Sequence, residues 1–182
     1  MPSNPPKLPV NEMSSRHPGL SDPVAASYLE AARVCLDRHH KPPVEFQLRD
    51  EDVLCKTKVD WHTADERSRG AWANEIDATE AGAYCCALAA TELARGLVAV
   101  RRAETKTGAD YYLAAAGEEV EDLENCLRLE VSGVDKGAEN LVAARLLEKI
   151  AQARRGHSNL PALAAVVGFR AQQISIKTVP PI

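Results

Sequence analysis

Apolar residues recur along the first third of the chain at two spacings, which predict a helix followed by a strand pair. Residues 24–36 show a helical apolar stripe that Ser21 is placed to cap, and we expect this helix to run to about His39. Two prolines then end it, and runs of alternating apolar and polar residues follow, as in half-buried strands. These strands are predicted at residues 44–48 and 53–61, with a hairpin turn at 49–52.

The rest of the chain continues this alternation through two long helices and a group of strands. Thr63 and Glu66 have capping-box spacing, so we expect a second helix from there to Gly96, with room for a pause at Gly70. Asp135 is placed to cap a third helix over residues 136–155. Strand patterns fill the remaining intervals, at residues 97–105, 109–114, 127–133, 163–169 and 173–179.

This order of elements favours an α/β (α+β) fold with a mixed central β-sheet flanked by helices. Aromatic residues make up only 4% of the chain while alanine is abundant, which is typical of helices packed closely on a sheet through small side chains. Residues 1–20 are rich in proline and polar residues, so we expect a disordered tail there. Residues 21–182 are predicted to form a single α/β domain.

Composition and charge limit the classes of protein and the cellular compartments that fit this sequence. Hydrophobic residues (45%) and charged residues (26%) are in ordinary globular proportion. The formal net charge of −4 argues against a strong electrostatic nucleic-acid binder but leaves room for a local basic groove. No apolar run approaches the roughly 18 residues of a membrane span, and no signal pattern opens the chain, so a cytoplasmic protein without membrane contact is expected.

The cysteines and histidines do not form a recognisable site. Five cysteines in apolar contexts, without CxxC spacing, are interpreted as reduced core residues: Cys35, Cys55, Cys85, Cys86 and Cys126. Three histidines lack partners at metal-ligand spacing and are interpreted as helix-capping or surface residues: His39, His40 and His62. The absence of GxGxxG, Walker and GxSxG motifs gives no support to a nucleotide-cofactor enzyme or a serine hydrolase.

Two acidic residues on neighbouring predicted strands are the main candidates for chemistry. Asp110 lies within residues 107–113, and Glu130 lies on the polar face of the strand at 127–133. In a hairpin their carboxylates would lie side by side, an unfavourable arrangement unless a divalent cation lies between them. Because hard oxygen ligands suit Mg²⁺, the sequence predicts a magnesium site formed by these two residues.

With these residues the chain resembles the PD-(D/E)xK nuclease superfamily over residues 72–170. A helix carrying Glu80 comes first, Asp110 matches the motif Asp on a strand pair, and Glu130 matches the motif Glu. The resemblance implies a restriction-endonuclease-like core, Mg²⁺ held by the carboxylates with Glu80 as a further ligand, and metal-assisted hydrolysis of a phosphodiester. The sequence departs from the motif at Ser132, which stands where the family has lysine.

Other basic side chains are candidates to provide the positive charge that the motif lysine provides in the family. Lys136 follows the strand, and Lys149 lies on the next helix, where Arg145 and Gln152 share its face because positions i, i+4 and i+7 project together. Four basic residues are candidates for binding nucleic acid: Arg101, Arg102, Lys106 and Arg145. Three more belong to the same basic surface: Arg95, Arg154 and Arg155.

Several functions are compatible with this pattern. The first is a Mg²⁺-dependent nuclease, or a catalytically degenerate relative, acting on DNA or RNA. The second is a non-catalytic protein-binding or assembly subunit that pairs with itself or another protein through a sheet edge or the Ala-rich helix. The third is a compact hydrolase of another type using the same carboxylates. A purely structural interpretation also stands, in which 127–133 is an exposed strand of a one-sided sheet and Arg128 pairs with Glu130.

Overall fold

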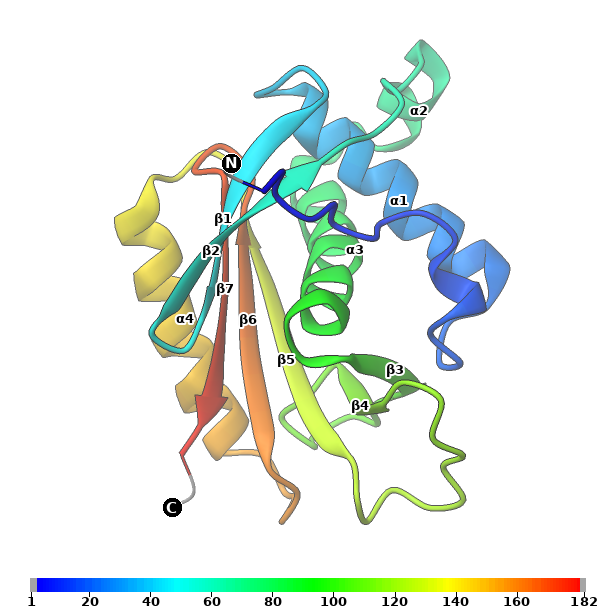
Figure 1. Ribbon diagram of the computed structural model, residues 1–182, viewed down its shortest axis with the longest axis vertical. Helices are drawn as coiled ribbons and strands as arrows, with labels where there is room; N and C mark the ends of the chain where they lie inside the picture. Colours follow the sequence, from blue (N-terminus) through cyan, green and yellow to red (C-terminus); the bar gives the residue numbers. More distant parts are fainter. Residues whose placement is uncertain (1–2, 181–182) are drawn as a thin grey trace.

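A seven-stranded mixed sheet forms the centre of the molecule in the computed structural model, which describes residues 3–180 (Figure 1). Its strand order is β2-β1-β7-β6-β5-β4-β3. The strands are β1 (Val44–Asp50), β2 (Val53–Val59), β3 (Leu97–Arg102), β4 (Tyr111–Ala115), β5 (Leu127–Val134), β6 (Ala162–Gly168) and β7 (Gln173–Val179). The helices are η1 (Met13–Ser15, a 3₁₀ turn), α1 (Asp22–Asp37), α2 (Glu66–Ala71), α3 (Glu75–Arg95) and α4 (Glu139–Arg154).

The sheet combines two antiparallel groups of strands through parallel pairs. Strands β3, β4 and β5 form an antiparallel meander, and α4 then carries the chain back so that β6 runs parallel to β5. Strand β7 is antiparallel to β6 and parallel to β1, which pairs with β2 in an antiparallel hairpin. The predicted α/β architecture with a mixed sheet is confirmed, and β2 and β3 are its edges.

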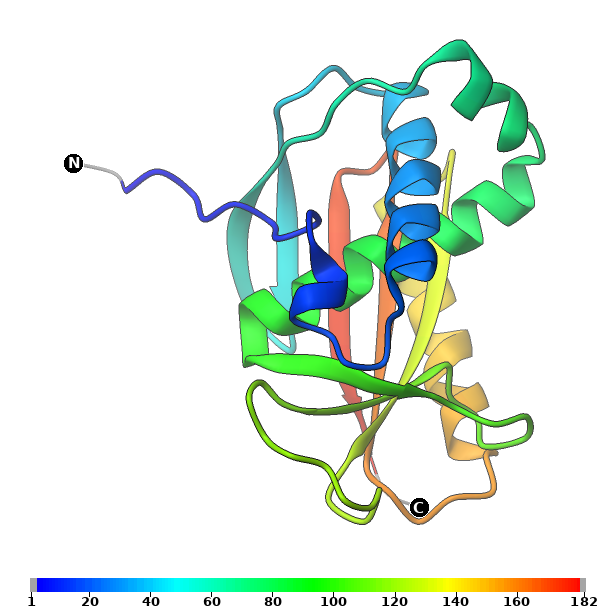
Figure 2. The same ribbon diagram turned by 90° about the vertical axis from the view of Figure 1, so that its right-hand side faces the viewer.

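Helices cover both faces of this sheet (Figures 1 and 2). Helices α3 and α1 lie on one face, where the main apolar core forms, and α4 packs against β5, β6 and β7 on the other. Small side chains allow α3 to pack closely against α1, since a Cβ added at Gly82 would lie 3.0 Å from the Cα of Ala32 on α1. Most of α3 is therefore buried. This Ala-rich helix is not available to pair with another protein, contrary to the alternative considered from the sequence.

Residues 6–20 belong to the folded structure, which corrects the expectation of a disordered tail for this part of the chain. Leu8, Val10, Met13 and Leu20 are buried in the main core. The amide of Leu8 donates to the carbonyl of Lys58 at 2.9 Å, so this segment covers one end of edge strand β2. The prolines between these residues suppress regular structure, but the spaced apolar side chains bury enough surface to hold the chain in place.

Helix boundaries differ from the predicted ones because other polar residues provide the caps. The helix predicted from Thr63 is two helices, α2 and α3, separated by residues 72–74, just after the pause expected at Gly70. Asp65 caps α2 and Asn74 caps α3, each by accepting backbone amides of the first turn. Capping depends on the local backbone angles of the accepting residue, which spacing alone does not determine.

Asp135 does not cap α4 but ties the end of β5 to the end of α1. Its carboxylate lies 2.9 Å from His39 Nε2 and 3.3 Å from Arg38 at the end of α1. The neighbouring His40 bonds to the carbonyl of Phe169 at 2.7 Å. These histidines are therefore links between α1 and the ends of β5 and β6, and not the surface or capping residues that we predicted.

The free cysteines divide into four buried residues and one exposed residue. Cys35, Cys85, Cys86 and Cys126 are buried, as expected, whereas Cys55 is exposed because β2 is an edge strand.

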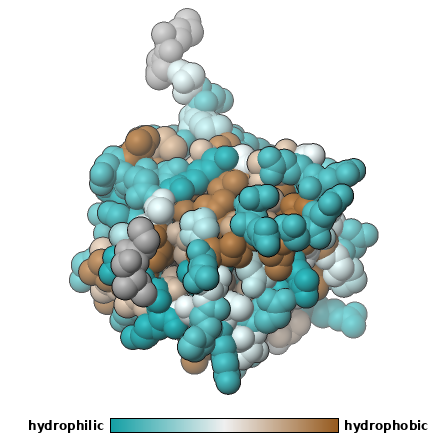
Figure 3. Space-filling view, turned by 90° about the horizontal axis from the view of Figure 1, so that it is seen from below, coloured by the Kyte–Doolittle hydropathy of each residue, from teal (hydrophilic) through white to brown (hydrophobic). Residues whose placement is uncertain are grey.

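Seen from the end of the molecule where β4 lies, the surface is mostly hydrophilic, with a short band of apolar side chains (Figure 3). None of the helices within residues 3–180 has the length and apolar character needed to cross a bilayer.

Candidate functional site

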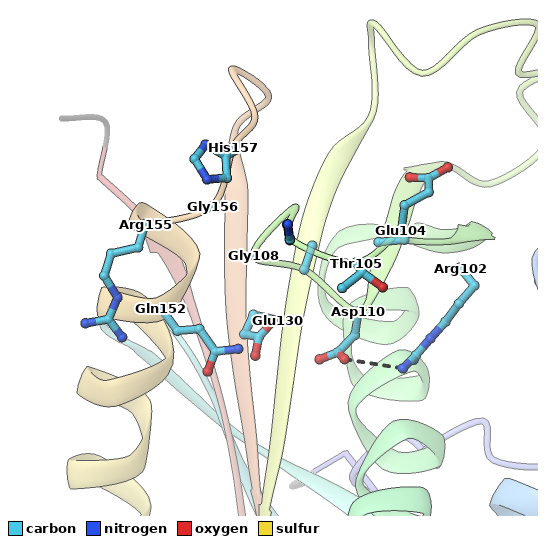
Figure 4. A pocket seen from close by; sticks show the side chains of 13 residues that line it. Arg102, Glu104, Thr105, Gly108, Asp110, Glu130, Gln152, Arg155, Gly156 and His157 are labelled. Carbon is cyan, nitrogen blue, oxygen red and sulfur yellow. Dashed lines mark hydrogen bonds and ion pairs between the residues drawn. The ribbon is translucent and has the colours of Figure 1, made fainter.

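A polar pocket of about 560 Å³ lies where the meander meets the end of α4 (Figure 4). It is lined by the end of β3, the loop at 103–110, Glu130 on β5, and the last turn of α4 with the residues that follow it. Asp110 and Glu130 both line it, as the order of the strands led us to expect. We call it the carboxylate pocket.

Asp110 is fixed at the entrance of β4 by hydrogen bonds to two other elements. Its amide donates to the carbonyl of Leu129 at 2.7 Å, and its Oδ2 accepts the amide of Val131 at 2.8 Å. Its Oδ1 accepts the hydroxyl of Tyr84 on α3, also at 2.8 Å. The carboxylate is therefore held on β5 from one side and on α3 from the other.

Glu130 lies at the centre of β5 and is nearly inaccessible, with 3% of its surface exposed. The ammonium of Lys149 on α4 donates to its Oε1 at 2.8 Å and to Gln152 Oε1 at 3.1 Å. Burial raises the pKa of Glu130 above its ordinary value, and the negative charge of Asp110 raises it further, while Lys149 opposes both effects. Both carboxylates line the same pocket.

The chemistry of the donors suits one hard cation between the two carboxylates. Asp110 and Glu130 line the same pocket, and Figure 4 shows Gln152 reaching toward Glu130 from α4. Mg²⁺ is commonly held by one or two carboxylates, with water and substrate phosphates completing its octahedron. Within residues 3–180, however, no three His, Cys, Asp or Glu side chains gather as a metal-binding group, so Glu80 does not complete a three-ligand set.

Of the two lysines considered for the missing charge, the structure brings only Lys149 to Glu130. Lys136 pairs with Glu75 at 2.9 Å, away from the carboxylate pocket. Lys149 also lines a second pocket of about 570 Å³ together with Glu80 and Arg145. Its ion pair with Glu130 therefore stands at the boundary between the two pockets.

The basic residues predicted to bind nucleic acid are divided between several places. Arg102, Lys106 and Arg155 line the carboxylate pocket. Three others pair with acidic residues: Arg101 with Glu104 of the pocket lining (2.9 Å), Arg145 with Glu148 (3.3 Å), and Arg95 with Asp50 (2.5 Å) and Glu51 (2.9 Å). Arg154 is exposed at the end of α4.

Arg128 does not pair with Glu130, which corrects the structural interpretation of this strand. Its guanidinium is buried beneath the pocket and donates to the carbonyls of Thr107, Ala153 and Leu160 at 2.7, 3.0 and 3.1 Å. It thereby ties the loop at 103–110 and the end of α4 to β5. Since α4 covers this face, Arg128 and Glu130 are buried, and β5 is not an exposed strand of a one-sided sheet.

Sequence reasoning missed two features of the pocket. Tyr84, which holds Asp110, lies in an Ala- and Cys-rich helix, and no spacing signal distinguishes it from a core residue. Gly156 lets the loop at 103–110 cross the end of α4, since a Cβ there would lie 2.2 Å from the carbonyl oxygen of Thr107.

Comparisons of the chain with protein-family models, with curated proteins and with solved structures found no match.

Proposed function

We propose that this protein is a Mg²⁺-dependent nuclease in which Asp110 and Glu130 hold the ion. The observation that carries the proposal is the meeting of these two carboxylates in one pocket, with Glu130 buried and bonded to Lys149 at 2.8 Å. A buried carboxylate beside another carboxylate is unfavourable in the free protein, and a dication relieves that repulsion. The site has the donor types that magnesium prefers.

The arrangement of elements around the pocket also supports the proposal. Helix α3, the strands β3 and β4 with Asp110, strand β5 with Glu130, helix α4 and strand β6 follow the order of the PD-(D/E)xK nucleases. Ser132 occupies the position of the family's lysine, and Lys149 brings an ammonium to the motif glutamate from α4 instead. The free thiols of the chain suit a reducing compartment, so we place this activity in the cytoplasm.

The residues of the pocket suit phosphodiester hydrolysis, in which a water oxygen joins phosphorus and one P–O ester bond breaks. One water proton ends on the leaving oxygen, and the other is released to solvent. A bound Mg²⁺ supplies Lewis acidity toward the phosphate and lowers the pKa of a water ligand. Lys149 places a positive charge where negative charge develops, and Arg102, Lys106 and Arg155 supply cations around the nucleic-acid backbone.

A cleavage assay tests this proposal. Labelled single- and double-stranded DNA and RNA are incubated with the full chain and Mg²⁺ or Mn²⁺, and we expect one of these substrates to be cut. Asp110→Asn and Glu130→Gln should each slow cleavage at least about 100-fold, because each removes a charged ligand. Lys136→Met removes a cation outside the pocket and should leave the rate unchanged. Absence of cleavage of all four substrates with both metals would refute the proposal.

A non-catalytic assembly subunit is the second candidate, and one observation favours it. Both oxygens of Asp110 already accept hydrogen bonds from the protein, as in a structural carboxylate. The chain would then pair with itself or with another protein through the part of edge strand β2 that residues 6–8 leave uncovered, since residues 17–19 already bond to Ala99 on the other edge strand, β3. Sedimentation that reveals a stable oligomer, together with no cleavage and no effect of Asp110→Asn on assembly, would favour this candidate.

A further inference from the structure

The guanidinium of Arg102 lies beside Asp110, in a position set by its contacts with two tyrosine rings. Its guanidinium carbon lies 4.7 Å from the ring centroid of Tyr84 and 4.9 Å from that of Tyr111. Its Nη2 donates to the Tyr84 hydroxyl at 3.1 Å but lies 3.5 Å from Asp110 Oδ1, which is long for a hydrogen bond. The contact with Asp110 is therefore the weaker of the polar contacts that hold this guanidinium.

The aromatic platform under Arg102 is itself fixed. The hydroxyls of Tyr28 and Tyr111 share a hydrogen bond of 2.6 Å, and the rings of Tyr84 and Tyr111 pack edge to face at 5.8 Å. The same three tyrosine rings belong to, or pack against, the main core. A cation on this platform keeps its place when its contact with Asp110 is lost, because the rings and the Tyr84 hydroxyl still hold it.

Arg102 also has donors to spare. In the part of the chain that the structure describes, its hydrogen bonds all come from Nη2, which leaves Nε and Nη1 without a protein acceptor. The side chain is 49% exposed and lines the carboxylate pocket. A planar guanidinium with unused donors is well suited to grip a phosphate group with two hydrogen bonds.

Each of the two carboxylates already has a side-chain cation beside it. Arg102 lies 3.5 Å from Asp110, and Lys149 lies 2.8 Å from Glu130. A dication on the two carboxylates would compete with both side-chain cations for the same oxygens. Once the ion occupies Asp110, the positive charge of Arg102 needs another anion, and the pocket is open to one on the solvent side.

We propose that Arg102 neutralises Asp110 in the metal-free protein and binds a backbone phosphate of the nucleic acid once a divalent ion has taken its place on Asp110. This inference rests on the proposed nuclease function and adds a coupling to it. Because the ion neutralises Asp110 in place of Arg102, and a phosphate then neutralises Arg102 on its platform, each ligand strengthens the binding of the other.

Two binding measurements on the full-length chain test this coupling. Calorimetric titration with Mn²⁺ alone should show Arg102→Met binding the ion about fivefold more tightly than the wild type, because a competing positive charge is gone. Binding of a phosphorothioate oligonucleotide in Ca²⁺ should instead weaken about tenfold. Lys136, an exposed lysine that pairs with Glu75 outside the carboxylate pocket, provides the control: Lys136→Met should leave Mn²⁺ affinity unchanged.

The opposite signs distinguish this role from a structural one, since a variant that merely disturbs the pocket loses affinity for both ligands. Arg102→Lys is the second variant and keeps the measurement decisive if Arg102→Met does not fold. It should bind Mn²⁺ like the wild type and the oligonucleotide several-fold more weakly, because it keeps the charge and loses the fork. Two results would show that Arg102 does not switch from Asp110 to a phosphate: Mn²⁺ binding by Arg102→Met that is no tighter than in the wild type, or full oligonucleotide affinity in Arg102→Lys. The nuclease proposal would stand after either result, provided that the wild type binds Mn²⁺. If the wild type binds no ion, both fail.

Discussion

At the scale of single residues, the molecule contains buried charges that are each matched by partners from other segments. Arg128 is the clearest case, because it bonds to carbonyls of Thr107, Ala153 and Leu160, which lie far apart in the sequence. Burial lowers the pKa of Arg128 from its ordinary value, and the three carbonyls compensate for the lost hydration. The loop that carries the edge of the carboxylate pocket thus depends on one guanidinium.

Replacement of Arg128 by methionine should reduce the free energy of unfolding by about 2–4 kcal/mol, because three carbonyls lose charge-assisted hydrogen bonds. Arg128→Lys should not restore the loss, since an ammonium lacks the planar fork that reaches three segments. Urea denaturation followed by circular dichroism measures both values. Arg101→Met, at a side chain that is 61% exposed, should change stability by less than about 0.5 kcal/mol. A stability of Arg128→Met equal to that of the wild type would contradict this account of the loop.

At the scale of elements, the segment before α1 is joined to the sheet through a buried histidine. His17 is fully buried, and its Nδ1 accepts the amide of Ala99 on β3 at 3.0 Å. The ring proton must then lie on Nε2, which donates to Glu92 Oε2 at 2.8 Å. Burial lowers the pKa of His17 below its ordinary value, although Glu92 acts in the opposite direction.

This lowered pKa gives a pH dependence of stability with a definite sign. The unfolded chain takes up a proton at His17 near pH 6.5, whereas the folded chain does so only at lower pH. The stabilisation is therefore complete above the unfolded pKa and is lost as the pH falls through the interval down to the folded pKa. Denaturation curves between about pH 5 and pH 7 should show wild-type stability falling more steeply than that of His17→Gln, which cannot titrate. Parallel curves for the two proteins would show that His17 is not buried in its neutral form.

At the scale of the whole molecule, the carboxylate pocket lies where all the layers meet. Helix α3 supplies Tyr84, the meander supplies Asp110 and Glu130, and α4 reaches from the opposite face with Lys149. The alternation of apolar and polar residues is local, so it placed the strands and the neighbouring positions of Asp110 and Glu130 correctly. The mixed sheet followed from the order of the elements.

Other features depend on contacts that no local pattern records. Alternation marks one face of β5 as polar, but it does not reveal that α4 covers that face and buries Arg128 and Glu130. The burial of Leu8 depends on the free edge of β2, which is distant in sequence. Arg102 was predicted as a phosphate-binding residue, whereas its platform on Tyr84 and Tyr111 arises only in the folded chain.

The central claim is that Asp110 and Glu130 together bind one divalent ion, and a calorimetric titration of the full chain with Mn²⁺ or Mg²⁺ tests it most directly. We predict one ion per chain, with affinity at least about tenfold lower in Asp110→Asn and in Glu130→Gln, since each variant loses a charged ligand. Lys136→Met, whose lysine pairs with Glu75 away from the pocket, should bind like the wild type. Equal affinity in the wild type and both carboxylate variants, or no binding to any of them, would contradict the claim.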